Sequence, residues 1–379
     1  MEYKEYELGE LLSYEQPTPY IVESTDYNDA YGTPVLTAGK SFILGYTDEK
    51  EGIYDQLPVI IFDDFTTASQ YVNFKFKVKS SAMKILTPVT ELVLPKYIYY
   101  RMQIINFDHS THKRYWIQQY SKIRVSVPPL PEQERIVSRI EELFSQLDAG
   151  VETLKKTKAQ LSVYRQAAIT EAFSVVNNTP NVCLSDIAQI IGGITKGRDL
   201  SGTETIELPY LRVANVQNGY LDLSEIKTIK LRVDEKERYL LKPGDVLYTE
   251  GGDRDKLGRG TVWRGEIKDC VHQNHVFKAR VDQSKAIPEY VAFWSMSTPA
   301  RNYFYQKGKQ SVNLASINKT VLSALTLPLP ALEKQREIIN HIESRLSVCD
   351  SIEQTVDTAL QQAEAMRQSI LTQAFGGAL

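Results

Sequence analysis

Residues 128–173 read PPLPEQERIVSRIEELFSQLDAGVETLKKTKAQLSVYRQAAITEAF. Residues 330–375, which lie 202 positions further along, read PALEKQREIINHIESRLSVCDSIEQTVDTALQQAEAMRQSILTQAF. The two segments align without a gap and agree at far more positions than the roughly three expected by chance from average residue usage. One long segment therefore occurs twice, which predicts the order variable region, repeat, variable region, repeat.

Both copies of the repeat have the period of a helix. Apolar residues recur at spacings of three and four, as in Ile136, Ile140 and Leu143 of the first copy. Such long, narrowly striped helices cannot bury their apolar seams alone, so they are expected to pack on each other as an antiparallel coiled coil. The alternative is two separate amphipathic helices, each lying on its own domain.

The length of the chain, 379 residues, suits two globular domains and a helical spacer. Both variable regions contain short runs of β-branched and aromatic residues bounded by Gly, Pro, Asn or Asp, which indicate strands. The predicted fold is α+β: two strand-rich, mixed α/β domains separated by two long helices in a pseudo-two-fold, circular organisation. The expected bounds are 1–127, first domain; 128–176, central helix; 177–329, second domain; and 330–379, C-terminal helix.

Composition and charge limit the classes of protein to which this chain can belong. The chain is 42% hydrophobic and 24% charged, with a net charge of −3, which is ordinary for a globular protein. No apolar run approaches the length of a membrane span and the start is acidic and polar, so we expect no membrane association and a cytoplasmic location. Three widely spaced cysteines predict reduced thiols.

Basic residues of the second variable region lie in glycine-rich stretches, at residues 192–198, 251–260 and 306–310. Lysine and arginine in loops between strands suit contacts to phosphates and base edges, so these loops favour nucleic-acid binding over ordinary surface charge. In the first region Lys75, Lys77 and Lys79 alternate along a strand. They fit either a stripe that faces DNA or an edge strand protected by lysines.

Catalytic patterns are weak. No Gly-x-x-x-x-Gly-Lys-[Ser/Thr] loop or methyltransferase motif is present. Asp63 and Asp64 are adjacent, so their side chains would point to opposite faces of a strand, which disfavours a nuclease site. Two sets of residues contain possible zinc ligands, but both lack a convincing fourth ligand and the usual spacing, which disfavours a zinc site. They are Cys270 with His272 and His275, and His109 with His112.

Four segments in order resemble one family. The repeats PPLPEQERIV and RQAAITEAF, together with LPYLRVANVQNG (208–219) and LKPGDVLYTEG (241–251), closely resemble the specificity subunit of Type I restriction-modification enzymes. The resemblance covers essentially the whole chain. It identifies the repeats with that subunit's spacer helices and the variable regions with its target recognition domains.

The resemblance implies a non-catalytic subunit that reads an asymmetric bipartite sequence of double-stranded DNA. It also implies two modification (methyltransferase) subunits and two restriction subunits as partners. Cofactors would belong to those subunits: S-adenosylmethionine for methylation, and ATP with Mg²⁺ for restriction. The alternative is a stand-alone methyltransferase or nuclease with built-in recognition domains, which a purified-chain assay would reveal.

Candidate DNA-binding residues are the polar and basic side chains of the predicted loops, because Asn and Gln can pair with adenine and Arg or Lys with guanine or phosphate. They are Thr37, Lys40, Thr66, Thr67, Lys113, Arg114, Lys196, Arg198, Arg212, Asn215, Gln217, Arg254, Lys256, Gln273, Asn274 and Lys309. Candidate partner-binding residues are polar residues that are identical at matching positions of the two repeats: Glu141, Arg165, Gln166, Glu343, Arg367 and Gln368. These same identities fit pairing between the two helices equally well.

Overall fold

The computed structural model describes residues 3–39, 41–108, 114–310 and 315–377. Two compact units make up the chain. Unit 1 contains residues 1–154 and 358–379, and unit 2 contains residues 155–357. Each unit therefore holds one globular domain together with one part of helix α3 (Leu130–Ala172) and one part of helix α9 (Leu332–Phe375).

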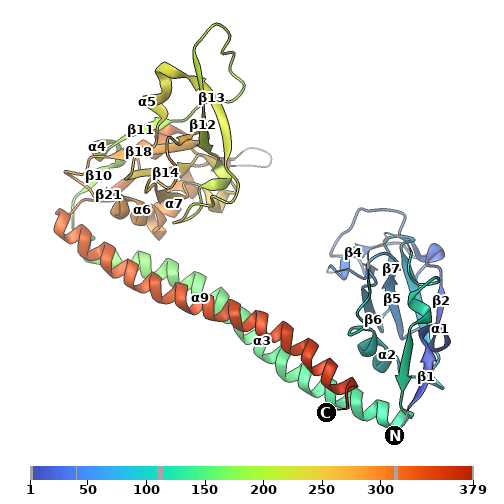
Figure 1. Cartoon of the computed structure of the whole chain (residues 1–379). Coiled ribbons are helices and arrows are strands. Elements are labelled where there is room, and N and C mark those ends of the chain that lie inside the picture. The colour runs from blue at the N-terminus through green and yellow to red at the C-terminus, as the bar shows by residue number, and fades with distance from the viewer. Residues whose placement is uncertain (1–2, 40, 109–113, 311–314, 378–379) are drawn as a thin grey trace. The chain divides into compact units, whose positions relative to one another are not determined.

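In both units α3 and α9 lie side by side and run antiparallel (Figure 1). In unit 2, Lys158 pairs with Asp357, Arg165 with Asp350, and Glu171 with Arg345, so positions rise along α3 as they fall along α9. The predicted apolar stripe forms the seam: Ile140 and Ile342 are fully buried. The predicted α+β class with a pair of long antiparallel helices is confirmed.

The first domain carries a four-stranded sheet, a three-stranded sheet and a two-stranded sheet among its described residues. Its elements are β1 (Lys4–Glu7), α1 (Leu8–Leu11), β2 (Leu12–Glu15), η1 (Thr18–Tyr20), β3 (Thr33–Leu36), β4 (Ile43–Thr47), β5 (Val59–Asp63), β6 (Ser69–Val72), β7 (Lys77–Val78), β8 (Met83–Pro88), α2 (Pro95–Met102), η2 (Tyr120–Lys122) and β9 (Arg124–Val127). One sheet has the order β2-β8-β5-β6 and the other β4-β3-β7, while β1 pairs with β9.

The second domain is built likewise. Its elements are η3 (Ser174–Val176), β10 (Asn181–Cys183), α4 (Leu184–Ile187), β11 (Ala188–Gly192), β12 (Thr205–Leu211), η4 (Val213–Asn215), β13 (Lys227–Arg232), η5 (Val233–Glu235), α5 (Lys236–Tyr239), β14 (Asp245–Thr249), β15 (Gly251–Gly252), η6 (Arg254–Lys256), β16 (Gly260–Val262), β17 (Val271–His272), β18 (Val276–Val281), α6 (Pro288–Met296), α7 (Thr298–Lys307), β19 (Lys309–Gln310), β20 (Ala315–Ser316), α8 (Lys319–Ser323) and β21 (Thr326–Pro328).

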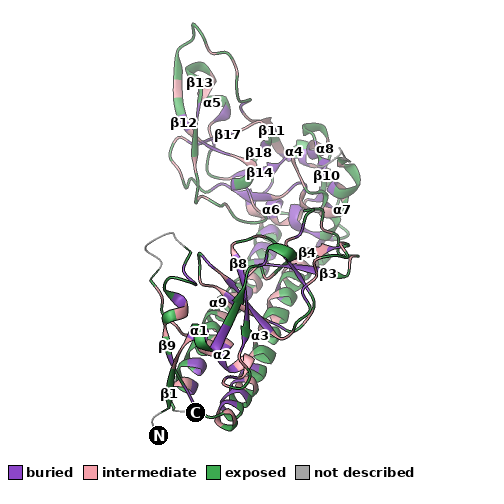
Figure 2. Cartoon of the chain, turned by 90° about the vertical axis from the view of Figure 1, so that its right-hand side faces the viewer, coloured by how far each residue is buried: buried purple, intermediate pink, exposed green. Residues whose placement is uncertain are grey.

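The two domains share one topology although their sequences do not resemble each other. The order β11-β18-β14-β16 matches β2-β8-β5-β6, and β13-β12-β17 matches β4-β3-β7. In both three-stranded sheets one pair is antiparallel and the other, β3·β7 or β12·β17, is parallel. The strands β5, β8, β14 and β18 are almost entirely buried (Figure 2). The second domain adds a small sheet, β15-β20-β19.

Each domain is joined to the helices by matching contacts. Helices α2 and α6 both begin with Pro-x-Tyr, and the hydroxyl groups of Tyr97 and Tyr290 donate to the carbonyls of Ser126 and Pro328. The ring of Tyr97 packs edge-on against Phe375, and that of Tyr290 against Phe173. Phe173 and Phe375 are the last residues of the two repeat segments, so the repeat supplies an aromatic anchor to each domain.

Candidate nucleic-acid interface

The turn between β17 and β18 holds Gln273 and Asn274 in a fixed backbone. The N–H of Gln273 donates to Leu211 O (3.0 Å) and the N–H of Asn274 donates to Ile194 O (2.9 Å). Both side chains are half-buried. A rigid backbone that presents amide side chains suits base reading, because little conformational entropy is lost on binding.

The loop 192–198 lies against this turn and brings Lys196 beside it. Ile194 forms a parallel bridge with Gln273, and a Cβ atom on Gly193 would lie 2.2 Å from the Gln273 carbonyl oxygen. Only glycine therefore permits this close approach. Lys196 is exposed, and its ammonium group lies 5.8 Å from the centre of the Tyr210 ring. The structure thus brings together Lys196, Gln273 and Asn274.

Next to the turn, His275 Nδ1 lies 2.8 Å from Glu250 Oε2. Glu250 leads into β15, which pairs with β20, and β20 in turn pairs with β19, where Lys309 is exposed. The predicted basic loops 251–260 and 306–310 therefore meet in one small sheet.

Two further candidates in these loops contact other residues of the second domain. Arg254 stacks 4.3 Å from the centre of the Tyr305 ring and its Nε donates to the Tyr305 carbonyl. Lys256 pairs with Asp253. Arg254 is exposed and the Lys256 side chain is 44% exposed, so both cations stay accessible to a phosphate.

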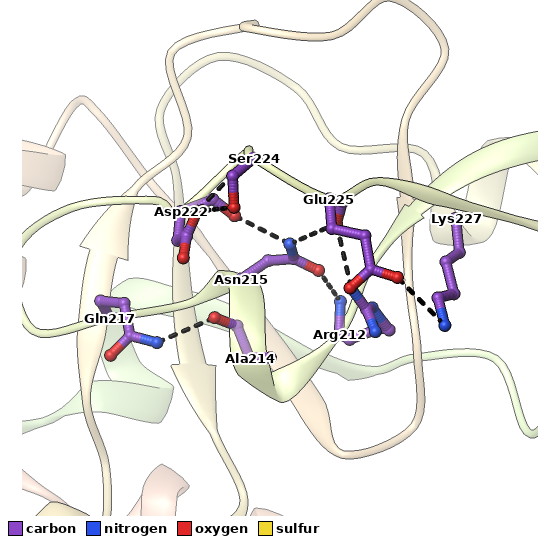
Figure 3. A network of polar contacts seen from close by, with 8 residues as sticks. All are labelled: Arg212, Ala214, Asn215, Gln217, Asp222, Ser224, Glu225 and Lys227. Carbon is purple, nitrogen blue, oxygen red and sulfur yellow. Dashed lines mark hydrogen bonds and ion pairs between the residues drawn. The ribbon is translucent and has the colours of Figure 1, made fainter. Parts of the chain in front are cut away.

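Arg212 and Asn215 belong to a network of polar contacts within the second domain (Figure 3). Asn215 is buried, its Oδ1 accepts the N–H of Arg212, and both of its amide N–H groups are used by the carbonyls of Asp222 and Glu225. Arg212 itself donates to the carbonyl and the carboxylate of Glu225. Asn215 is therefore reassigned from base reading to holding the segment 212–225, because no amide proton remains for a base.

Arg198 and Gln217 are also committed to neighbours. Arg198 forms a bidentate ion pair with Glu235 at 2.9 and 3.0 Å, which holds the pKa of the Glu235 carboxyl below its usual value. Gln217 donates to Ala214 O and accepts from Arg259. A guanidinium held in this way is better suited to shaping the loop than to binding phosphate.

In the first domain, three candidates lie around Asp64, the residue that follows β5. Thr66 and Thr67 continue the turn after Asp64, and Thr67 has a positive φ of 55°. The carbonyl of Asp64 accepts the N–H of Tyr115, which places the exposed Arg114 close to that turn. The Arg114 guanidinium lies 5.9 Å from the centre of the Phe65 ring.

The remaining first-domain candidates are less informative. Thr37 is half-buried and its hydroxyl accepts the N–H of Gly39, as in a local turn. Lys40 and Lys113 lie outside the described residues, as do His109 and His112.

The lysine stripe of the first domain is interrupted. Lys77 is buried and pairs with Glu49 at 2.6 Å, whereas Lys75 and Lys79 are exposed. Strand β7 does lie at the edge of its sheet. A buried lysine cannot form part of a face that DNA touches, so the continuous stripe is not present.

The disfavoured metal and nuclease interpretations find no geometric support. Asp63 Oδ1 accepts the N–H groups of Phe65 and Thr66, and Asp64 is buried against Lys84 (3.2 Å). Burial lowers the pKa of His272 to about 4, and its Nδ1 lies 2.6 Å from Val276 O. Among the described residues no group of three His, Cys, Asp or Glu side chains comes together as a metal site requires.

The partner-binding candidates lie mostly in two equivalent grooves. The α2 groove, of about 550 Å³, lies between α2, α3 and α9 in unit 1 and is lined by Glu141, Arg367 and Gln368 among others. The α6 groove, of about 910 Å³, lies beside α6, α3 and α9 in unit 2 and is lined by Arg165 and Gln166. Glu343 lines a separate depression of about 300 Å³.

These candidate side chains also make contacts within the chain. Arg165 pairs with Asp350 and Glu353, and Arg367 pairs with Asp148. Glu141 pairs with Lys96, and Gln166 donates to Met296 O. Arg165 and Arg367 therefore join the two helices to each other, whereas Glu141 and Gln166 join α3 to α2 and α6.

Comparison with known proteins decides the family. The family model described as Type I restriction modification DNA specificity domain matches residues 1–162 and 178–362. The chain belongs to this family.

Relatives agree with this assignment, and a solved structure has the same fold. The chain is 32% identical to the Escherichia coli Type I restriction enzyme EcoR124I/EcoR124II specificity subunit, over 91% of this chain and 87% of that protein. It is 26% identical to the EcoKI specificity subunit of Escherichia coli strain K12, over 69% of this chain and 58% of that protein. A chain in a solved structure of the type I restriction-modification system has the same fold, with a TM-score of 0.69 at 17% identity, covering 100% of this chain and 98% of that one.

The family settles the kind of protein. A Type I specificity subunit recognises the DNA target and is not itself a catalyst, so the predicted non-catalytic class is confirmed. DNA and the other restriction-modification subunits are its partners. Of the helices that the structure describes, none has the length and apolarity to cross a membrane.

Sequence reasoning missed two features of this specificity subunit. The Pro-x-Tyr starts of α2 and α6 were not recognised as a second repeat, although Pro95 and Tyr97 recur as Pro288 and Tyr290. The second feature is the turn after β7, which matches the Gln273 turn. The sequence offers Lys79 only as part of a lysine stripe, and the shared topology alone relates the two turns.

Proposed function

We propose that this specificity subunit reads an asymmetric bipartite DNA target, with one half-site for each recognition domain. The observation that carries the proposal is the shared topology of two domains whose exposed loop residues differ. The same backbone with different polar side chains would present the same surface to DNA while reading different bases. Because the two sets of side chains differ, the two half-sites should differ as well.

In the second domain the base-reading set is centred on Gln273 and Asn274, with Lys196, Arg254, Lys256 and Lys309 around them. Cations on mobile or edge segments suit phosphates, which fix the register of the duplex but carry no sequence information. In the first domain Thr66, Thr67 and Arg114 take the corresponding place. Lys40 and Lys113 remain proposals from the sequence alone.

The specificity subunit also holds two modification subunits, one in the α2 groove and one in the α6 groove. The support is the repetition: each groove is lined by a cross-helix Arg–Asp pair, by the glutamine next to that Arg, and by the helix that starts with Pro-x-Tyr. Two equivalent surfaces suit two copies of one partner. Two restriction subunits join this assembly. S-adenosylmethionine, and ATP with Mg²⁺, are bound by those other subunits.

Sequencing of methylated DNA tests the recognition proposal. The chain is produced with its modification subunit in a host that lacks other methyltransferases, and the methylated sites are aligned. We expect one motif with two unequal half-sites and a gap. Exchange of residues 177–329 for the corresponding domain of a relative should change one half-site only, and a change in both would contradict the modular assignment. The purified chain alone should transfer no methyl group and cleave no DNA.

Bulky substitutions in the grooves test the partner proposal. Ser145→Trp fills the α2 groove and Ser162→Trp fills the α6 groove, and both serines are exposed residues that line them. Each variant should bind one modification subunit, and the double variant none, as measured by native mass spectrometry. Ser138→Trp, at an exposed position of α3 outside the groove, is the control and should bind two. Two bound subunits in the double variant would exclude the grooves.

A further inference from the structure

The turn after β7 in the first domain has the same backbone hydrogen bonds as the Gln273 turn in the second. The N–H of Lys79 donates to Leu36 O (3.0 Å), as the N–H of Gln273 donates to Leu211 O (3.0 Å). One residue earlier, Val78 O accepts the N–H of Val22 (3.0 Å), as His272 O accepts that of Ile194 (2.8 Å). The two turns are therefore equivalent positions of the shared topology.

The residue whose N–H donates to the end of each turn is also equivalent in the two domains. In the second domain, the N–H of Glu250 donates to His275 O (2.9 Å) and its carbonyl accepts the N–H of Ile317 (2.8 Å). In the first domain, the N–H of Asp64 donates to Ala82 O (2.9 Å) and its carbonyl accepts the N–H of Tyr115 (2.9 Å). Glu250 directly follows β14 and Asp64 directly follows β5, which are matching strands. Each domain thus joins three segments in the same way.

Two of the three segments in the first domain already hold candidate residues, namely Thr66 and Thr67 after β5, and Arg114 on the returning segment. The third is the turn Lys79–Ala82. Lys79 and Ser81 are exposed there. The Lys79 ammonium lies at the edge of bonding distance from the Tyr27 hydroxyl, at 3.5 Å, a weak contact that DNA can replace.

We infer that the turn Lys79–Ala82 determines specificity in the first domain and contacts base edges of its half-site, as the counterpart of Gln273–His275. The inference rests on the proposed function. The chemistry of the side chains sets what each turn reads. Gln273 and Asn274 match the donor and acceptor pattern of adenine, whereas Lys79 matches the two acceptors of guanine, O6 and N7. Ser80 and Ser81 accept or donate at either base.

Paired substitutions test the inference by sequencing of methylated DNA from the assembled methyltransferase. Lys79→Ala with Ser81→Ala should relax one base position in one half-site, and Gln273→Ala with Asn274→Ala one position in the other. The loss of discrimination at that position should be about tenfold to a hundredfold. Lys122→Ala and Lys230→Ala, exposed lysines outside the two turns, are controls that should leave the motif unchanged.

A transplanted turn gives a gain of function that an unfolded variant cannot mimic. Lys79→Gln with Ser80→Asn places the side chains of the second turn on the first. The Ser80 hydroxyl accepts the N–H of Ala82 (3.4 Å), and an Asn side chain can make the same local bond. We expect the first half-site to shift towards adenine at one position.

Failure of the inference and failure of the proposed function would give different results. Uniform weakening of methylation with an unchanged motif would show that Lys79 binds phosphate, and an unchanged motif with unchanged activity would show that the turn does not contact DNA. Either result overturns the inference. A wild-type motif without two half-sites would instead overturn the proposed function.

Discussion

Gln133 and Gln335 occupy the same place in the two repeats and make the same hydrogen bonds. The Oε1 atom of each accepts a backbone N–H from the residue before the Pro-x-Tyr helix, Leu94 or Ile287, at 2.8 Å in both cases. The Nε2 atom of each donates to the first residue of its own repeat, Pro128 or Pro330. Both side chains are fully buried. One amide thus fastens each recognition domain to the start of a long helix.

Substitution of Gln133 should loosen the first domain from its helix. Gln133→Ala leaves the N–H of Leu94 and two carbonyls unpaired in a buried place, which costs about 1–3 kcal/mol for a buried donor or acceptor. The midpoint of thermal or urea unfolding should fall accordingly. Gln146→Ala removes an exposed glutamine of the same helix and should leave the midpoint unchanged. Equal effects from the two variants would contradict the assigned role.

Loss of Asp64 should strongly destabilise the first domain. Asp64 and Lys84 form an ion pair at 3.2 Å with side chains 2% and 1% exposed. Asp64→Ala leaves a buried ammonium without its counter-charge, so we expect a loss of about 3–5 kcal/mol in the free energy of unfolding.

A second ion pair of the same domain serves as the control for Asp64. Lys75 and Asp55 have side chains 69% and 58% exposed, and Asp55→Ala should cost under about 1 kcal/mol. The variant Asp64→Leu with Lys84→Met, which removes both charges, should recover part of the loss. Stability no better than that of Asp64→Ala would argue against an unpaired charge as the cause.

The stability of the second domain should fall in acid because of His272. Burial lowers the pKa of His272 in the folded state to about 4, whereas an unfolded histidine titrates near its ordinary value of about 6.5. Between these values the unfolded chain binds more protons, so the free energy of unfolding decreases as pH falls from about 6.5 towards 4.

Urea unfolding at several pH values measures this effect. His272→Leu removes the titrating ring and should flatten the dependence within that window, whatever its effect on stability at neutral pH. An unchanged slope would mean that other groups cause the acid sensitivity.

The repeated cross-helix ion pairs should contribute little stability. Arg165 and Asp350 lie 2.6 Å apart, but the Asp350 side chain is 70% exposed. A double-mutant cycle with Arg165→Met and Asp350→Ala should give a coupling energy under about 1 kcal/mol. A coupling of several kcal/mol would show that this pair, rather than the apolar seam, holds α3 to α9 in unit 2.

The long helices and the fold class follow from the sequence pattern alone. A repeat of apolar residues at helical spacing leaves few ways to bury the stripe, and the identical residues Gln133 and Gln335 carry the same contacts because the same segment folds twice. Local pattern also indicated that both variable regions contain strands, because they hold β-branched and aromatic runs bounded by glycine or proline.

Which polar side chains face solvent depends on the folded arrangement of the chain. Lys77 and Asn215 look like surface residues in the sequence, yet Glu49 and the carbonyls of Asp222 and Glu225 make their burial possible. The sequence offered Lys79 only as part of a lysine stripe, and its turn became a candidate for base contacts because its backbone bonds match those of the turn at Gln273. Burial of a polar group depends on partners that the fold brings together. The spacing of residues along the sequence does not show which residues those partners are.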